Sequence, residues 1–302
     1  MINSGTDVSG RALTLSEVVL SCAILVFGTL LLLSRLPRAR EESRAVSCIS
    51  NLAQIGQAML LYSQNHNDTL PVVNIWSGID ANPGTSPLFA FRQDLQIGDF
   101  LNVNSQIKSS DKSKFNPEPQ RIAGLRCPSD RSIMLPLSTN YRANTGVNAR
   151  GESGTFSIGS RQNLNEIEKL DGLAFTAAFS ERLLGDGTNG ESVQNYRRFE
   201  ICQDTVAFGV NGNSNINDVQ GNAGHDWSRG DWRNTLYHHG LLPNWKYSAI
   251  AVKDNCGQMG TSSGHVRNVN VLLLDGSVRS WKDTVDPIIW KRLGGISDGS
   301  GN

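Results

Sequence analysis

Hydrophobic and polar positions are unevenly distributed along this chain, because one long apolar run lies near its start. Residues 13–34 read LTLSEVVLSCAILVFGTLLLLS and contain a single charged residue, Glu17. At a helical rise of about 1.5 Å per residue the run extends about 33 Å, which matches a bilayer core of about 30 Å. The pattern therefore predicts a transmembrane helix over 13–34. A carboxylate in such a segment is costly and usually functional.

The residues after this run keep a helical period. From Val46 to Leu60, apolar residues recur at spacings of three and four, which predicts a helix whose apolar face packs against a globular part. Pro37 is expected to kink this helix. Residues 72–120 are mixed and suggest a lobe with short helices. A polar cluster is expected to end the long helix: Asn65, Asn67 and Asp68.

The later part of the chain has the short apolar runs of β structure. From residue 121 on, these runs are separated by Gly, Asn and Asp, and 173–179 and 250–252 are expected to be buried strands. Apolar residues alternate over 269–273, and Asp275-Gly276 then leads into a second β-prone run. This order predicts a hairpin with a type I′ turn, which needs positive φ at both central residues. Asp275 is therefore interpreted as a turn residue.

Charge and size limit the possible partners. The chain has 302 residues with 28 basic and 28 acidic side chains, and phosphate binding needs a basic excess. We therefore expect no nucleic-acid partner. Roughly 230 residues follow the long helix, enough for one large domain or two small ones.

The five cysteines are widely spaced. Cys22 lies in the apolar run and is interpreted as a small packing residue. The other four form no CxxC pair, which argues against a zinc cage. On the outer side of a membrane they allow two disulfides in three pairings. We favour Cys48–Cys127 with Cys202–Cys256, and four buried thiols are the alternative.

Three interpretations of the N-terminal segment compete. A cleavable secretory signal has a shorter apolar core followed by a small-residue cleavage site, and neither is present here. A plain signal anchor remains open. The third interpretation is that residues 12–17 (ALTLSE) resemble the class III signal of type IV prepilins and pseudopilins. In that family a small residue, usually Gly, precedes the cleaved bond, and Glu is the fifth residue of the mature chain.

This resemblance implies roles for three residues. Ala12 takes the place of the usual Gly, Leu13 becomes the new N-terminus and a site of methylation, and Glu17 becomes the fifth residue. Prepilin peptidase is the implied processing partner. Glu17 would pair with the free amine of a neighbouring subunit in the bilayer, which would offset the cost of a lone acid there. The alternative is that Glu17 reaches the cytoplasmic surface.

Two features of the sequence predict opposite orientations of the chain in the membrane. Only Arg11 precedes the apolar run, whereas a group of arginines follows it: Arg35, Arg38, Arg40 and Arg44. The positive-inside rule would place the large part in the cytoplasm, but the prepilin-like motif implies the opposite. We follow the motif and expect a single-pass protein of the inner membrane, with its C-terminal part periplasmic or extracellular.

A second resemblance lies further along the chain. His265, nine residues and then Asp275-Gly276 resemble the His-x9-Asp-Gly signature of DUF1559 proteins, which are large families of prepilin-like proteins. Four other segments resemble motifs of the same family: 48–56 (CISNLAQIG), 125–130 (LRCPSD), 140–146 (NYRANTG) and 171–181 (DGLAFTAAFSE). The last of these departs from the family motif, because its residues LAF replace the usual Thr-Ser-Asn.

The DUF1559 resemblance implies an α+β, pseudopilin-like fold. A long N-terminal helix would pack on an antiparallel sheet that carries a large, mixed, mostly β insertion. The expected divisions are a leader at 1–12, a transmembrane helix at 13–34, a helical extension at 35–68 and an extracytoplasmic globular domain at 69–302. The resemblance implies no known activity.

Two glycine-rich segments match motifs of catalytic or binding proteins. Ser262 lies in a G-x-S-x-G match without a preceding strand and a following helix, so a turn is favoured. The G-x-G-x-x-G match over 185–190 has no helix after it, which argues against a dinucleotide site. Its loop offers oxygen ligands for calcium as a minor alternative: Asp186, Asn189 and Glu191.

Four histidines are candidates for a metal site. His238 and His239 are adjacent, and adjacent strand residues point to opposite faces, so no metal set with His225 and His265 is expected. His265 is expected to form hydrogen bonds that brace the hairpin. A tryptophan cluster is interpreted as packing, with a carbohydrate platform as the alternative: Trp227, Trp232 and Trp245, beside Tyr237.

These observations lead to one main functional expectation. We expect a non-enzymatic, membrane-anchored structural protein of the cell envelope, a subunit of a type II secretion-like or pilus-like assembly. Its partners would be the lipid bilayer, prepilin peptidase, and itself or other pseudopilins. The alternative is a membrane-anchored module that does not assemble and binds glycans or envelope proteins. No catalytic residue, cofactor or metal is expected.

Overall fold

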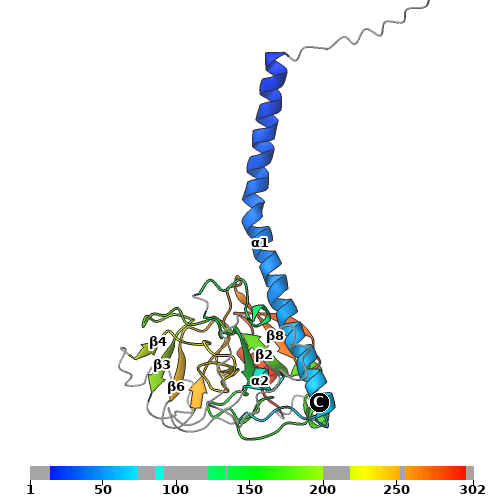
Figure 1. Cartoon of the computed structure of the whole chain (residues 1–302), viewed down its shortest axis with the longest axis vertical. Coiled ribbons are helices and arrows are strands. Elements are labelled where there is room, and N and C mark those ends of the chain that lie inside the picture. Colours follow the sequence, from blue (N-terminus) through cyan, green and yellow to red (C-terminus); the bar gives the residue numbers. More distant parts are fainter. Residues whose placement is uncertain are drawn as a thin grey trace, which may run out of the picture. The chain divides into compact units, whose positions relative to one another are not determined.

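The computed structural model describes residues 14–73, 86–91, 122–132, 135–199, 218–251 and 256–296. The chain divides into two compact units, Met1–Ser43 and Arg44–Asn302. Helix α1, Leu15–Asn65, has 51 residues and continues through Pro37 (Figure 1). The predicted leader and its processing residues, Ala12 and Leu13, lie outside the described residues.

The first unit presents an apolar helix surface. Within the described part of the chain, no helix combines the length and the apolarity needed to cross a membrane. Large apolar side chains of α1 are 43–82 % exposed in this unit: Leu15, Val18, Val19, Leu20, Ile24, Leu25, Val26, Phe27 and Leu30.

Glu17 has a local role that the sequence analysis missed. Its Oε2 accepts hydrogen bonds from the backbone N and the Oγ1 of Thr14, both at 2.9 Å. In return, Thr14 Oγ1 accepts from the backbone N of Glu17 at 3.4 Å. This reciprocal arrangement is a capping box, which satisfies backbone donors at the beginning of a helix. Glu17 therefore helps to begin α1.

The end of α1 and its buried face match the prediction. The helix ends at Asn65, and Asn67 and Asp68 follow with φ of 55° and 56°, a left-handed conformation that cannot continue a helix. The predicted period is confirmed by the buried side chains of Leu52, Ile55 and Met59. Val46, the first residue of the predicted stripe, is instead 66 % exposed, and Cys48, which lies outside that stripe, is buried. Gly56 lets the helix approach closely, since a Cβ there would lie 2.7 Å from Leu272 Cδ1.

The main sheet has five strands in the order β5-β1-β2-β8-β9. Neighbouring strands are antiparallel, except that β1 and β5 are parallel. Their bounds are β1 Tyr141–Asn144, β2 Ala177–Glu181, β5 Leu236–Tyr237, β8 Asn268–Leu273 and β9 Val278–Lys282.

Helices pack on both faces of this sheet because side chains of β8 alternate between them. Leu272 and the adjoining Leu274 join the core that contains the second half of α1. Val271 and its same-face neighbours join Trp290 and Leu293 of α5, Pro287–Gly294. Figure 1 shows α1 beside β2 and β8 in this unit. The strand β8 is therefore the centre of a helix–sheet–helix arrangement.

A second, mixed sheet is inserted into the first. Its order is β4-β3-β6-β7, with β3 and β6 parallel and the other pairs antiparallel. All four strands come between β2 and β8, which are neighbours in the main sheet. The α+β fold is thus confirmed, but both sheets are mixed, whereas an antiparallel sheet was predicted. The bounds are β3 Tyr196–Phe199, β4 Val219–Gln220, β6 Ser248–Ala251 and β7 Cys256–Gln258.

The remaining elements are short and show one wrong prediction. Residues 173–179 were predicted as one strand, but Leu173–Phe175 forms the 3-10 turn η2 and β2 begins at Ala177. Gly172 has φ of 81°, and Phe175 is 65 % exposed, so the chain turns here. Most of the predicted lobe at 72–120 lies outside the described residues. The other short helices are α2 Pro87–Ala90, η1 Ala123–Leu125 and α4 Leu164–Leu170.

The predicted hairpin is confirmed as β8–β9, but its turn type is different. Gly276 has φ of 85°, whereas Asp275 is not among the residues with positive φ. Gly276 N donates to Leu273 O at 3.0 Å, and Leu273 N donates to Ser277 O at 2.8 Å. This pattern belongs to a three-residue loop, in which a type I turn is followed by a left-handed Gly. Asp275 is a turn residue, as predicted, and its Oδ1 accepts from Ser277 N.

Candidate functional site around a buried disulfide

The centre of the site is a disulfide between Cys48 of α1 and Cys127, which follows η1. Their Cα atoms are 4.9 Å apart, and 79 residues separate them in sequence. Both are buried, and the predicted pairing is confirmed. Cys256 is also disulfide-bonded, whereas Cys202, the partner predicted for it, lies outside the described residues. Cys22 is a free, exposed cysteine.

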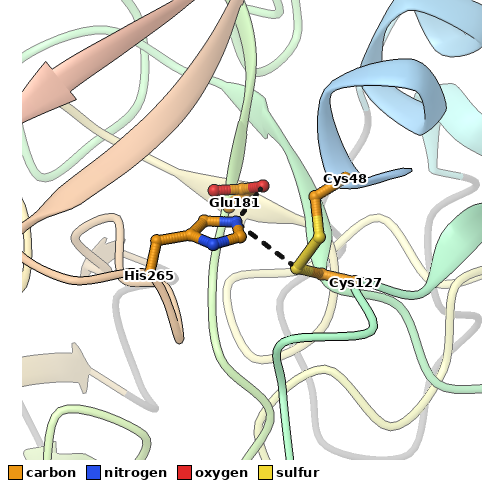
Figure 2. A group of neighbouring side chains, drawn as sticks. All are labelled: Cys48, Cys127, Glu181 and His265. Atoms are coloured by element: carbon orange, nitrogen blue, oxygen red, sulfur yellow. Dashed lines mark hydrogen bonds and ion pairs between the residues drawn. A yellow bond between two sulfur atoms is a disulfide. The ribbon is translucent and has the colours of Figure 1, made fainter. Parts of the chain in front are cut away.

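A carboxylate and an imidazole lie against this disulfide. His265 Nε2 is 3.4 Å from Glu181 Oε1 and 3.7 Å from Cys127 Sγ. Figure 2 shows the imidazole between the carboxylate and the sulfur atoms. Glu181 is the last residue of β2, and His265 comes from the segment that leads into β8. Their exposed fractions are 1 % and 8 %, so this is a polar cluster inside the protein.

Glu181 is held in place by strand β8. Its Oε2 accepts from Asn270 N at 2.9 Å, and its Oε1 accepts from Asn270 Nδ2 at 3.0 Å. A buried carboxylate needs several donors to offset the loss of water. Asn270 supplies two of them and fixes the orientation of the carboxylate toward His265.

The Cys127 side of the disulfide is ordered by Asn140. Asn140 Oδ1 accepts from Cys127 N at 3.1 Å, and its Nδ2 donates to Asp130 Oδ2 at 2.5 Å and to Arg182 O at 3.0 Å. Asp130 Oδ2 also accepts from Leu184 N at 2.8 Å. These bonds connect the Cys127 segment to the residues that follow β2.

The Cys48 side is ordered by Asn51 and Tyr141. Asn51 Nδ2 donates to Arg126 O at 2.8 Å and to the hydroxyl of Tyr141 at 3.1 Å. That hydroxyl donates to Cys48 O at 3.4 Å. Burial, and next the charge of Glu181, raise the pKa of Tyr141 well above its usual value. Tyr141 is therefore a neutral hydrogen-bonding group.

The segments singled out in sequence thus meet in one place. Residues 48–56, 125–130, 140–146 and 171–181 each supply a member of the network, and His265 completes it. The sequence identified these segments but did not predict that they meet in one place. It also did not mark Glu181 or Asn270 as site residues. The available signal was a glutamate at the end of an apolar strand, where a charge needs a partner.

The family of the chain follows from a comparison with family models. A model described as "Protein of unknown function (DUF1559)" matches residues 37–288. The chain belongs to the DUF1559 family. No curated protein and no solved structure matches it. The resemblance read from the His265 signature and the four motifs is therefore confirmed, and residues 12–17 precede the matched region.

Other candidate residues of this DUF1559 protein serve the fold. The hydroxyl of Ser262 accepts from Leu183 N at 3.1 Å and donates to Val193 O at 3.4 Å. Asp186 accepts from Thr188 N at 2.8 Å and from Asn195 Nδ2 at 2.8 Å. The hydroxyl of Ser262 and the carboxylate of Asp186 are thus used within the loops that contain them.

His238 and His239 follow β5 and contact different groups. His239 Nδ1 is 3.0 Å from Trp290 O and its Nε2 is 3.0 Å from the hydroxyl of Tyr237. His238 Nδ1 accepts from Gly240 N at 2.6 Å. Burial lowers the pKa of each imidazole to about 3. Both are therefore neutral at pH 7 and act as fixed hydrogen-bonding groups.

The contacts of His265 connect it to the hairpin through a second residue. Its imidazole lies against Glu181 and Cys127, and the carboxylate of Glu181 accepts from Asn270 of β8, the first strand of the hairpin. The tryptophan cluster is divided by burial. Trp227 and Trp232 are 2 % exposed and pack in the core, while Trp245 is 42 % exposed.

One group of side chains in the structure has the chemistry of metal ligands. Within the described ranges, the atoms of four buried residues that can ligate a metal lie within 4.8 Å of one another: Cys48, Cys127, Glu181 and His265. Of the four histidines that were considered and not expected to form a metal set, only His265 belongs to this group. In the disulfide form the sulfur atoms are not thiolates, which are the ligands that metals need.

The Glu181→Gln variant tests the network directly. Both carboxylate oxygens face donors, so an amide NH₂ must face at least one N–H group and leave it unpaired. We expect a loss of about 1–3 kcal/mol in the free energy of unfolding, measured by urea denaturation. Glu152→Gln is the matched control at an exposed glutamate and should stay within about 0.5 kcal/mol. Equal stability of the two variants would refute the role assigned to Glu181.

Proposed function

We propose that this chain is a non-enzymatic, membrane-anchored structural protein of the cell envelope that assembles through α1 in the manner of prepilins. The observation that carries the proposal is the exposed apolar surface of α1 between Leu15 and Leu30. Such a surface is costly in water and marks a helix that binds lipid or other helices. The DUF1559 match, with the prepilin-like order of residues 12–17, supports the same conclusion.

In this proposal the two halves of α1 have different roles, and the second half holds the globular unit. Its apolar face belongs to the core of the globular unit, and the disulfide at Cys48 fixes it covalently. A pull on the helix would then pass into the globular unit through a covalent bond. Disulfides persist in oxidising compartments, which supports a periplasmic or extracellular globular unit.

Glu17 is assigned two successive roles in this proposal. In the single chain its carboxylate caps α1 through Thr14. After prepilin peptidase cleaves behind Ala12, the carboxylate would pair with the free amine of Leu13 in a neighbouring copy or another pseudopilin. Glu17→Gln separates these roles, because Gln also forms capping boxes but carries no charge.

Assembly is tested through Cys22, which is free, exposed and located in the apolar half of α1. Bismaleimide treatment of intact cells should cross-link wild-type copies through Cys22, and Cys22→Ala should abolish the product. Glu17→Gln should lose cross-linking while remaining in the carbonate-washed membrane fraction. Thr14→Ala is the matched control, which weakens the cap by about 1 kcal/mol but keeps the charge, and it should still cross-link.

Two results would overturn the proposal. One is recovery of the full-length wild type in the soluble fraction without detergent. The other is undiminished cross-linking of Glu17→Gln. Mass spectrometry of the mature N-terminus is the companion measurement, and we expect a free or methylated Leu13.

A second candidate function is a membrane-anchored module that does not assemble and binds glycans or envelope proteins. It is favoured by Trp245, which is 42 % exposed and whose ring centroid lies 6.2 Å from that of Tyr247. Exposed aromatic rings commonly contact sugar rings or protein partners. Absence of cross-linking in the wild type, together with loss of binding to envelope material in Trp245→Ala, would favour this candidate.

A further inference from the structure

Two distances in the buried cluster match those of a tetrahedral metal site. With metal–sulfur bonds of about 2.3 Å and metal–nitrogen or metal–oxygen bonds of about 2.05 Å, tetrahedral ligands lie about 3.4 Å apart for N and O and about 3.6 Å for N and S. His265 Nε2 is already 3.4 Å from Glu181 Oε1 and 3.7 Å from Cys127 Sγ. The two sulfur atoms are too close because they are bonded, and the other three distances among the four ligand atoms are no longer than 4.8 Å.

The chemistry of the four ligands selects a class of metal. Two thiolates, one imidazole and one carboxylate are the ligand types that bind Zn²⁺. All four residues are buried, and Figure 2 shows their side chains directed toward a common point. Two thiolates and a carboxylate carry three negative charges, so a divalent cation would remove most of the charge in this interior position.

The surroundings already hold the ligands as metal sites require. Asn270 donates twice to Glu181, and Asn140 accepts from the backbone N of Cys127. The backbone N of His265 donates to Ser263 Oγ at 3.1 Å. Such outer bonds orient the ligands of metal sites, and here they are in place while the disulfide is formed.

We propose that reduction of the Cys48–Cys127 disulfide converts this cluster into a zinc site formed by Cys48, Cys127, Glu181 and His265. A dithiol reductant supplies two electrons and two protons, the S–S bond breaks into two thiols, and the dithiol becomes a disulfide. Each thiol releases its proton when its sulfur binds Zn²⁺. Helix α1 is then joined to the Cys127 segment by a covalent bond in the oxidised state and by the metal in the reduced state. This inference does not depend on the proposed function.

The test uses the full chain with Cys22→Ala, which removes the free thiol. The protein is reduced with a phosphine without oxygen and titrated with Co²⁺ as a spectroscopic probe. We expect thiolate-to-cobalt charge-transfer absorption and tetrahedral d–d bands, saturation at one ion per chain, and displacement by Zn²⁺. The oxidised protein should show none of these signals.

Substitutions of the proposed ligands test which side chains bind the metal. Glu181→Gln and His265→Gln keep both cysteines and should weaken Co²⁺ binding by at least about tenfold, the loss that even an outer partner commonly causes. The matched control, Cys202→Ser with Cys256→Ser, should retain the site. Circular dichroism of each reduced protein, with and without Zn²⁺, checks its fold.

Four outcomes would overturn the inference. The first is a reduced, folded chain that binds no Co²⁺. The second is binding that is undiminished in both Glu181→Gln and His265→Gln, and the third is binding that disappears in the Cys202 and Cys256 control. The fourth is a reduced chain that unfolds equally with and without excess Zn²⁺.

Discussion

Replacing Cys48 and Cys127 together with alanine is expected to lower the free energy of unfolding by about 4–5 kcal/mol. The two residues are 79 positions apart, and the chain-entropy model assigns this cost to the freedom that the unfolded chain gains when a loop of that length opens. The loss of packing at two buried positions acts in the same direction. Urea denaturation followed by circular dichroism measures the effect.

The control for this experiment is Cys22→Ala, because Cys22 is exposed and free. It should change the free energy of unfolding by no more than about 0.5 kcal/mol. A double variant as stable as this control would mean that the hydrogen bonds around the disulfide, and not the covalent bond, fix α1 to the globular unit.

Acid is expected to destabilise the globular unit through His238 and His239. Burial lowers the pKa of both imidazoles from 6.5 to about 3. Above pH 6.5 both are neutral whether the chain is folded or unfolded. Between pH 6.5 and about 3 only the unfolded chain binds these protons, so the free energy of unfolding falls as pH falls, by up to about 1.4 kcal/mol per pH unit for each histidine. Below pH 3 the effect stops growing.

The measurement compares urea denaturation of the wild type with that of His238→Gln and His239→Gln from pH 7 to pH 4.5. Other acidic groups contribute to the same curve, so the difference between wild type and variant is the relevant quantity. Each variant should show a shallower loss of stability with acid. Parallel curves for all three proteins would show that these imidazoles do not control the acid sensitivity.

Local patterns allowed the correct prediction of elements with a clear period. The helical stripe predicted from Val46 to Leu60 and the alternation in β8 depend on neighbours within a few residues. The alternation was confirmed, and so was the stripe from Leu52 to Met59, whereas Val46 is exposed. The strand predicted over 173–179 failed because an apolar run does not show where a chain turns. Gly172 with positive φ places that turn before Ala177.

The candidate site could be predicted only as separate pieces. Its members come from α1, β2, β8 and two connecting segments, and they meet because β2 and β8 are paired while a whole sheet lies between them in sequence. No local pattern contains that pairing. The Thr14–Glu17 capping box, in contrast, has a local signature in its T-x-x-E spacing, which overlaps the prepilin-like motif.

The pairing of β2 with β8 has a consequence for how such proteins diversify. Glu181 ends β2 and His265 precedes β8, and their side chains meet there. The polypeptide between them forms the second sheet and also gives β5 to the edge of the main sheet. Changes of length on either side of β5 can therefore alter the inserted sheet while both attachment points keep their separation, whereas β5 itself must stay to pair with β1.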